Sequence, residues 1–275
     1  MLATGGKPRS ELWITSKIDP KVYCDAADPE ATALAMVQET LSQLNTSYVD
    51  LVLLHEPCNR DSTQPHPSDQ KAWNALMHAV KSGWARAIGV DKYAIPQMAA
   101  LQGTRPAVLM APMSMSQHDD VCYLLLLSVF LPAHAARCCD TTCPSVIEVF
   151  FLCPPPPRPP LSPPHLLRGH PLGKATIAYC QQNNIHYNAF GVVHGCKFTD
   201  EAVVSAATKY NVSTSQVCGA WTRQRGCSMA VGIGTDPSKM SQYTHEDLDI
   251  FSFNLTASEM DALNKLQRTV PVTAD

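Results

Sequence analysis

The feature that most constrains the fold is a repeated alternation of short apolar runs with amphipathic segments. The run at residues 48–55 is almost continuously apolar, and such runs fit strands that are covered on both faces, as in a parallel sheet. Strands that alternate with helices of ten or more residues predict a parallel α/β fold. Six strands are expected, at residues 11–17, 48–55, 85–90, 107–111, 185–193 and 228–233.

Helices are expected between these strands. Asp28 suits the N-cap of a helix that starts at Pro29, and apolar residues then recur every three or four positions, at Leu34, Val37, Leu41 and Leu44. A second apolar stripe is interpreted as the core-packing face of a helix and consists of Trp73, Leu76, Met77, Val80 and Trp84. Further helices are predicted at residues 95–101, 174–184, 200–209, 213–225 and 257–266.

The alternation is interrupted between residues 119 and 172. Of the 22 prolines and 11 cysteines in the chain, eight prolines lie between residues 154 and 164, and five cysteines lie between residues 122 and 153. Such a proline tract favours extended polyproline II over a helix or a central strand. We therefore predict an inserted, low-complexity and disordered segment that divides the α/β domain into parts at residues 1–118 and 173–275. The segment is interpreted as a translated intron or mis-spliced exon, with a genuine loop as the alternative.

The cysteines do not suggest a metal site. Cys138, Cys139 and Cys143, with His134 nearby, lack the spacing of paired zinc ligands, so no metal is expected. The start of the sequence shows no basic stretch followed by an apolar one. The six cysteines outside the insert are therefore interpreted as reduced thiols, and a cytoplasmic location is expected, with an organelle as the alternative.

Composition excludes several classes of function. The formal net charge is −3, which offers no electrostatic field for nucleic acid, and no nucleic-acid partner is expected. No apolar run reaches the roughly 18–20 residues of a membrane-spanning helix, so no membrane partner is expected either. The apolar fraction of 45% is enough to build a core.

Four segments, in order, resemble the aldo-keto reductases. They are Leu12-Trp-Ile-Thr-Ser-Lys17, Leu41-x-x-Leu-x-x-x-Tyr-Val-Asp-Leu-Val-Leu-Leu-His-Glu-Pro57, Val80-Lys-Ser-Gly-Trp-Ala-Arg-Ala-Ile-Gly-Val90 and residues 249–263. The resemblance covers residues 8–118 and 173–270, on both sides of the insert. It implies a (β/α)₈ TIM barrel that transfers a hydride from NADPH to a small-molecule aldehyde or ketone.

The resemblance also implies roles for individual residues. Lys17 matches the family's catalytic lysine and His55 its catalytic histidine, while Glu56 stands at a substrate-pocket position. The family's catalytic tyrosine protonates the carbonyl oxygen, the lysine lowers the pKa of that tyrosine, and the histidine orients the carbonyl. The implied cofactor-binding positions are Asp91, Lys92, Met110, Phe190, Gly234, Thr235 and Lys239.

Two family elements have no match before Lys17. The family's catalytic aspartate and tyrosine come from its second strand and the helix that follows, and the sixteen residues before Lys17 contain neither motif. We therefore expect an incomplete barrel of about six parallel strands, without the first two βα units, and an inactive or impaired reductase. The alternative is a non-catalytic relative that senses a nucleotide or binds a partner. Open sheet edges would favour self-association.

Overall fold

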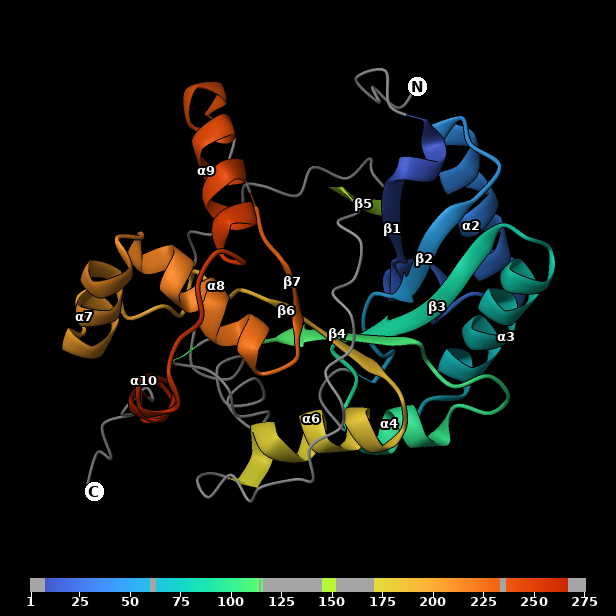
Figure 1. Cartoon of the computed structure of the whole chain (residues 1–275). Helices are drawn as coiled ribbons and strands as arrows, with labels where there is room; N and C mark the ends of the chain where they lie inside the picture. Colours follow the sequence, from blue (N-terminus) through green and yellow to red (C-terminus); the bar gives the residue numbers. More distant parts are fainter. Residues whose placement is uncertain are drawn as a thin grey trace, which may run out of the picture. The chain divides into compact units, whose positions relative to one another are not determined.

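A computed structural model describes residues 8–59, 63–113, 115, 145–151, 171–232 and 236–266. The chain divides into two compact units (Figure 1). The first unit holds the described residues up to Leu109 together with residues 145–151, and the second holds those from Met110 to 115 and from Pro171 onward. Gly234 and Thr235 lie outside the described residues.

The first unit is built on three parallel strands, β1 (Leu12–Ile18), β2 (Val49–Leu54) and β3 (Ala85–Asp91). In β2 all six residues are buried, as expected from its continuous apolar run. The register places Lys17 beside Leu53 and Leu53 beside Gly89. The fourth predicted strand is β4 (Val108–Pro112), which crosses the boundary between the units.

Helices complete the first unit. Helix α2 (Pro29–Leu44) begins where Asp28 predicted, because the Asp28 carboxylate accepts hydrogen bonds from the N–H groups of Glu30 and Ala31. It packs against α3 (Pro67–Lys81), whose buried face contains Trp73 and Leu76. Val80 of the predicted stripe is exposed, and the small Ala72, Ala75 and Ala79 are buried instead. The remaining helices are the short 3₁₀ helix Arg9–Glu11, α1 (Pro20–Tyr23) and α4 (Ile95–Ala100).

Strand β5 (Ser145–Phe151) differs from the prediction, because it lies inside the segment that was expected to be disordered. It pairs antiparallel with β1 along its whole length, with Leu12 opposite Phe151 and Ile18 opposite Ser145. The backbone of β5 therefore occupies the outer edge of β1, and β5 takes the edge position of the sheet in its place. Self-association through sheet edges stays a prediction. The rest of residues 119–172 is mostly outside the described residues, and the division into domains stays a prediction.

The second unit also alternates strands and helices. Strands β6 (His186–Phe190) and β7 (Ser228–Ala230) are parallel neighbours, and the N–H of Met113 donates to the carbonyl oxygen of Phe190. Its core includes the fully buried Trp221. The helices are α6 (Pro171–Gln182), α7 (Glu201–Tyr210), α8 (Thr214–Gln224), α9 (Pro237–Asp249) and α10 (Ala257–Leu263).

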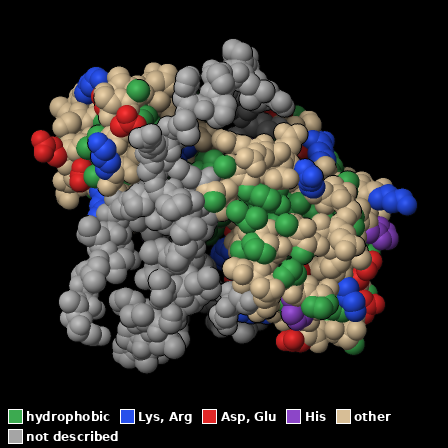
Figure 2. Space-filling model, turned by 90° about the horizontal axis from the view of Figure 1, so that it is seen from below, with side chains coloured by type: hydrophobic (Ala, Val, Ile, Leu, Met, Phe, Trp, Pro, Cys, Tyr) green, Lys and Arg blue, Asp and Glu red, His purple; other side chains and the backbone are tan. Residues whose placement is uncertain are grey.

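All six predicted strands are confirmed, whereas α1, β5 and α9 were not predicted. Helix α9 has no regular apolar stripe, and it is identified by its cap, because the Asp236 side chain accepts from the N–H of Ser238. Among the described residues, no helix is long and apolar enough to cross a bilayer. Figure 2 shows hydrophobic side chains on the surface between polar ones.

The interpretation of the cysteines as reduced thiols is wrong for four of the six. Cys24 and Cys58 form a disulfide in the first unit, and Cys196 and Cys218 form another in the second. Cys180 and Cys227 belong to neither of these disulfides and are buried, as structural thiols usually are. The pairs were missed because their partners are 34 and 22 residues apart in the sequence, and only the fold brings them together.

Candidate active site

Three charged or ionisable side chains meet at the carboxyl-terminal ends of β1, β2 and β3. Lys17 Nζ lies 3.2 Å from Asp91 Oδ2, and His55 Nε2 lies 3.9 Å from the same oxygen. The Asp91 side chain is only 1% exposed and that of Lys17 8%, whereas His55 is 25% exposed. The ion pair between Lys17 and Asp91 is therefore buried, while the imidazole of His55 reaches solvent.

The strand register explains why these side chains meet. Lys17, Leu53 and Gly89 are neighbours across the three strands, so their side-chain positions share one face of the sheet. His55 and Asp91 each lie two residues farther along the chain and therefore return to that face. The long lysine side chain spans the remaining distance to the carboxylate.

Gly89 allows the strands to approach at this point. A Cβ atom placed on Gly89 would collide with the carbonyl oxygen of Val108 and would lie 2.7 Å from Leu53 Cδ2. Glycine is thus required for the close packing of β3 against its neighbours, two residues before Asp91.

A second ion pair lies in the loops that leave β2 and β3. Lys92 Nζ is 3.8 Å from Glu56 Oε2, and both side chains are largely buried. Lys92 has a φ of +61°, in the left-handed region that residues with a Cβ rarely adopt. Glu56 directly follows His55, and Lys92 directly follows Asp91. The second pair therefore joins the chain neighbours of His55 and Asp91.

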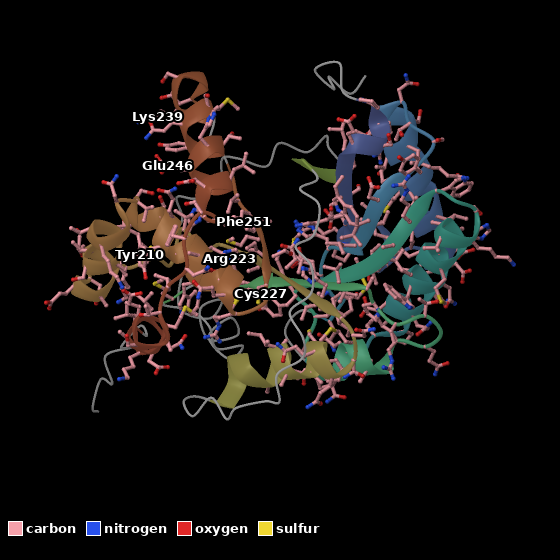
Figure 3. All side chains as sticks on the ribbon, in the orientation of Figure 1. Tyr210, Arg223, Cys227, Lys239, Glu246 and Phe251 are labelled. Atoms are coloured by element: carbon pink, nitrogen blue, oxygen red, sulfur yellow. A yellow bond between two sulfur atoms is a disulfide. The ribbon has the colours of Figure 1, made fainter. Side chains whose placement is uncertain are left out.

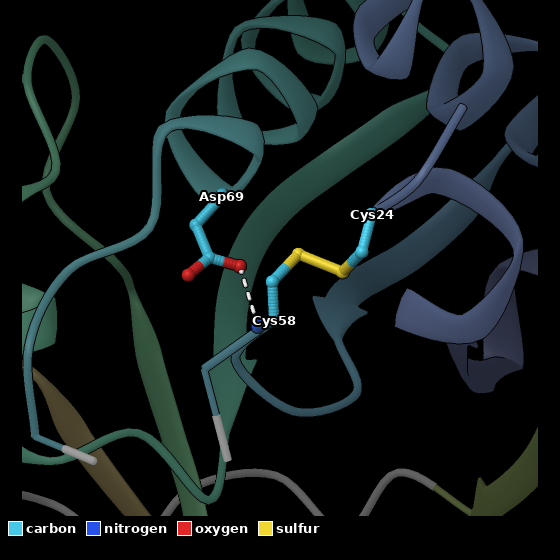
Figure 4. Close-up of side chains that lie close together, drawn as sticks. All are labelled: Cys24, Cys58 and Asp69. Carbon is cyan, nitrogen blue, oxygen red and sulfur yellow. Dashed lines mark hydrogen bonds between the residues drawn. A yellow bond between two sulfur atoms is a disulfide. The ribbon is translucent and has the colours of Figure 1, made fainter. Parts of the chain in front are cut away.

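A disulfide and a buried carboxylate tie the same loops together (Figure 4). Cys24 follows α1, and Cys58 lies three residues after His55. The Asp69 carboxylate accepts a hydrogen bond of 3.0 Å from the Cys58 N–H and another of 3.0 Å from the Tyr93 hydroxyl. Burial raises the pKa of Asp69 above its usual range, although both hydrogen bonds lower it.

The cysteines and Asp69 have ligand atoms within 4.8 Å of one another, a grouping that could suggest a metal site. The two sulfur atoms are bonded to each other, however, so they cannot act as thiolate ligands in this state. The prediction that the protein uses no metal stays a prediction.

Two tyrosines near these loops are buried. Burial, and after it the nearby Asp69 carboxylate, raises the pKa of Tyr23 well above its ordinary value. The pKa of Tyr93 is raised by burial and by the proximity of Tyr23 and Asp69. Both hydroxyls therefore hold their protons tightly. The third described tyrosine of the first unit, Tyr48, stacks against Arg9 and Arg86 instead.

The remaining predicted site residues belong to the second unit. Met110 is fully buried in β4, and Phe190 is half-buried at the end of β6. Lys239 is exposed in the first turn of α9 (Figure 3). The structure thus brings together Lys17, His55, Asp91, Glu56 and Lys92 in the first unit. Their assigned roles, and those of the second-unit residues, stay predictions.

The loop cluster of Cys24, Cys58, Asp69 and Tyr93 was not recognised in the sequence. Asp69 looks like an ordinary first-turn acidic residue of α3, and nothing local marks its contacts across the loops. Asp91 was predicted as a cofactor-binding position, but its contact with Lys17 depends on the strand register, which the sequence alone does not give.

The comparisons with known proteins identify the family that this chain resembles. The model of the aldo/keto reductase family matches residues 1–125, which contain all five site residues of the first unit. The resemblance to the aldo/keto reductases is thereby confirmed. Similar curated proteins include an uncharacterized oxidoreductase of Schizosaccharomyces pombe, which is 22% identical over 262 residues. That alignment covers 95% of this chain and 70% of the relative.

Two further relatives have named activities. Methylglyoxal reductase DkgB of Escherichia coli O157:H7 is 25% identical over 229 residues, with 83% of this chain and 64% of the relative covered. NADPH-dependent codeinone reductase 1-2 of Papaver somniferum is 24% identical over 290 residues, with 98% of this chain and 70% of the relative covered. The chain thus spans about two thirds of the length of these aldo/keto reductase relatives.

Solved structures show the same fold. An aldo/keto reductase from Brucella melitensis superposes with a TM-score of 0.65 at 18% identity and covers 96% of this chain and 76% of its own. An aldo-keto reductase of Bombyx mori in complex with NADP gives a TM-score of 0.63 at 20% identity, with 96% and 71% covered. The fold is therefore that of the aldo/keto reductase barrels. The absence of the first two βα units stays a prediction.

Proposed function

We propose that the chain is an NADPH-dependent oxidoreductase of aldo/keto reductase type that reduces small aldehydes or ketones, with impaired turnover. The observation that carries the proposal is the meeting of Lys17 and His55 at the carboxyl-terminal ends of adjacent parallel strands. Barrel enzymes hold their reacting groups at this end of the sheet. The lysine cation and the imidazole N–H can stabilise the negative charge that develops on a carbonyl oxygen.

The cofactor is assigned from the family and from the residue types present. NADPH, when bound, supplies the hydride. Phe190 offers an aromatic face at the end of β6, and Lys239 offers an exposed cation for a phosphate group. Asp91 is less suited to contact NADPH, because its carboxylate is already paired with Lys17. These positions support a nicotinamide nucleotide with weakened contacts.

The impairment follows from the tyrosines. Tyr23 and Tyr93 are buried with raised pKa values, and Tyr48 is stacked against two arginines, so none of the three is a good proton donor to a carbonyl beside Lys17. His55, which reaches solvent, is then the group that would deliver the proton. We expect turnover below that of a complete site by about 10²–10⁴-fold, the usual contribution of a positioned acid.

The proposal is tested with the purified full chain. NADPH binding is followed by quenching of protein fluorescence, and turnover by the loss of NADPH absorbance with methylglyoxal as the substrate. Slow turnover that disappears in both Lys17→Met and His55→Gln, with NADPH binding retained, is the expected result. A chain that binds no nucleotide would contradict the proposal. Binding without any turnover would favour the non-catalytic nucleotide-sensing alternative.

A further inference from the structure

Asp91 occupies a position that the family resemblance assigns to the cofactor, yet its contacts are with the protein. The carboxylate is the last residue of β3 and is almost fully buried. Its Oδ2 atom lies within ion-pair distance of Lys17 and of His55, from two different strands. A buried carboxylate is costly unless a cation compensates it, so Asp91 and Lys17 depend on each other.

The arrangement of the neighbouring charges supports the same conclusion. Glu56 and Lys92 follow His55 and Asp91 directly in the sequence and form an ion pair of their own, with 3.8 Å between Lys92 Nζ and Glu56 Oε2. Lys17 is thus the cation closest to Asp91 among the ion pairs of this end of the first unit. Removal of the Asp91 charge would take from the buried lysine the carboxylate oxygen that lies 3.2 Å from its Nζ atom.

We propose that Asp91 is a positioning residue, which through one carboxylate oxygen holds the Lys17 ammonium and the His55 imidazole at the carbonyl-binding end of the sheet. The proposal deepens the function proposed above and rests on it for the roles of Lys17 and His55. The geometry of the three side chains itself can be tested without nucleotide or turnover.

The first experiment measures the accessibility of the Lys17 amine. The folded chain is treated with acetic anhydride, and the acetylation rate of Lys17 is followed by peptide mass spectrometry. In Asp91→Asn the amine loses its ion pair with the Asp91 carboxylate, and we expect the rate at Lys17 to rise by about fivefold. Asp91→Glu, which keeps the charge, should restore most of the protection. An unchanged rate in Asp91→Asn would overturn the proposal.

Asp69→Asn is the matched control. Asp69 is also a buried carboxylate at this end of the first unit, but its Oδ1 accepts hydrogen bonds from the Cys58 N–H and the Tyr93 hydroxyl. An amide oxygen can still accept both bonds. The Lys17 rate should stay at the wild-type value in this variant. A rise as large as that in Asp91→Asn would show that general loosening of the loops, rather than the ion pair, exposes Lys17.

A double-mutant cycle covers the case in which Asp91→Asn folds poorly. The double variant Lys17→Met with Asp91→Asn carries neither buried charge, so it should unfold at a higher temperature than Asp91→Asn alone. A double variant that is no more stable than Asp91→Asn would contradict the pairing. Since neither readout uses NADPH, a chain that fails to bind nucleotide would refute the proposed function and leave the role of Asp91 to be decided by these measurements.

Discussion

Asp50 is a buried carboxylate at the opposite end of the first unit from the candidate site. It accepts hydrogen bonds from Arg9 at 2.8 Å, from Arg86 at 3.1 Å and from the N–H of Ile14 at 2.9 Å. Both guanidinium groups also lie 4.1 Å from the centre of the Tyr48 ring. Buried carboxylates therefore lie at both ends of the first unit's strands. Asp50 stabilises the end at which the strands begin.

Asp50→Asn is predicted to lower the free energy of unfolding by about 3 kcal/mol, because breaking a buried ion pair leaves its partners uncompensated. Arg86→Met should cost less, about 1 kcal/mol, since the Arg86 side chain is 55% exposed. Urea denaturation at neutral pH measures both. Equal losses of unfolding free energy in the two variants would show that Asp50 stabilises the fold through packing rather than through its charge.

Gly89→Ala is the second prediction at the residue scale. The added methyl group meets the Val108 carbonyl and Leu53, and neither backbone nor buried leucine can move freely, so we expect a loss of about 2–3 kcal/mol. Gly232→Ala is the control, because nothing lies within 4 Å of a Cβ at that position. Thermal unfolding of the two variants should differ clearly. A tolerated Gly89→Ala would mean that β3 and β4 are less closely packed than described.

At the scale of elements, local sequence signals predicted well and non-local ones did not. The Asp28 side chain caps α2 as expected. Asp200 and Ser213 were the first residues of two predicted helices, and their side chains cap α7 and α8. Strand β5 depends on pairing with β1, more than 100 residues away, and its sequence context of cysteines and prolines pointed elsewhere. Lys17 and His55 came from the resemblance, whereas their link through Asp91 needed the register.

Helix α10 provides a pH-dependent prediction. Burial alone would raise the pKa of Glu259, but hydrogen bonds from Lys209, the Thr256 N–H and Tyr210 hold it at about 2, below the ordinary 4.5. A depressed pKa stabilises the fold above the unfolded value, and this contribution is lost as the pH falls from about 4.5 towards 2.

Glu259→Gln should therefore lower the free energy of unfolding by about 1 kcal/mol at pH 7, after allowance for solvent screening. The difference in the free energy of unfolding between variant and wild type should become smaller as the pH is lowered to 3. Urea titrations across this range measure the difference. A gap that stays constant with pH would assign the effect to the capping hydrogen bonds rather than to the charge. Lys265→Gln, a lysine outside this cluster, is a suitable control for loss of one charge.

At the scale of the whole molecule, the part of each compact unit that the structure describes contains one disulfide. Cys24–Cys58 closes a stretch with a sequence separation of 34 residues, and Cys196–Cys218 closes one of 22. The stabilisation expected from the restricted unfolded chain is about 3–4 kcal/mol for each. The sequence did not predict the pairs, because cysteine spacing alone does not define a connectivity.

Reduction should destabilise both units, and the double serine variants separate the effects. Cys24→Ser with Cys58→Ser should unfold the first unit more easily, and Cys196→Ser with Cys218→Ser the second. Trp221 is the one tryptophan of residues 110–275, so a chain with Trp13, Trp73 and Trp84 changed to Phe reports on the second unit. If Trp221 fluorescence shifted to the same extent in both serine variants, the two units would unfold as one.

The pairing of β5 with β1 has a consequence for any neighbour on that side. A strand has one set of backbone N–H and C=O groups along each edge, and β5 uses the set on the outer edge of β1 from Leu12 to Ile18. In a complete barrel the preceding parallel strand would need these same groups. The two arrangements exclude each other, so a parallel strand of that kind could pair with this edge of β1 only after β5 has left it.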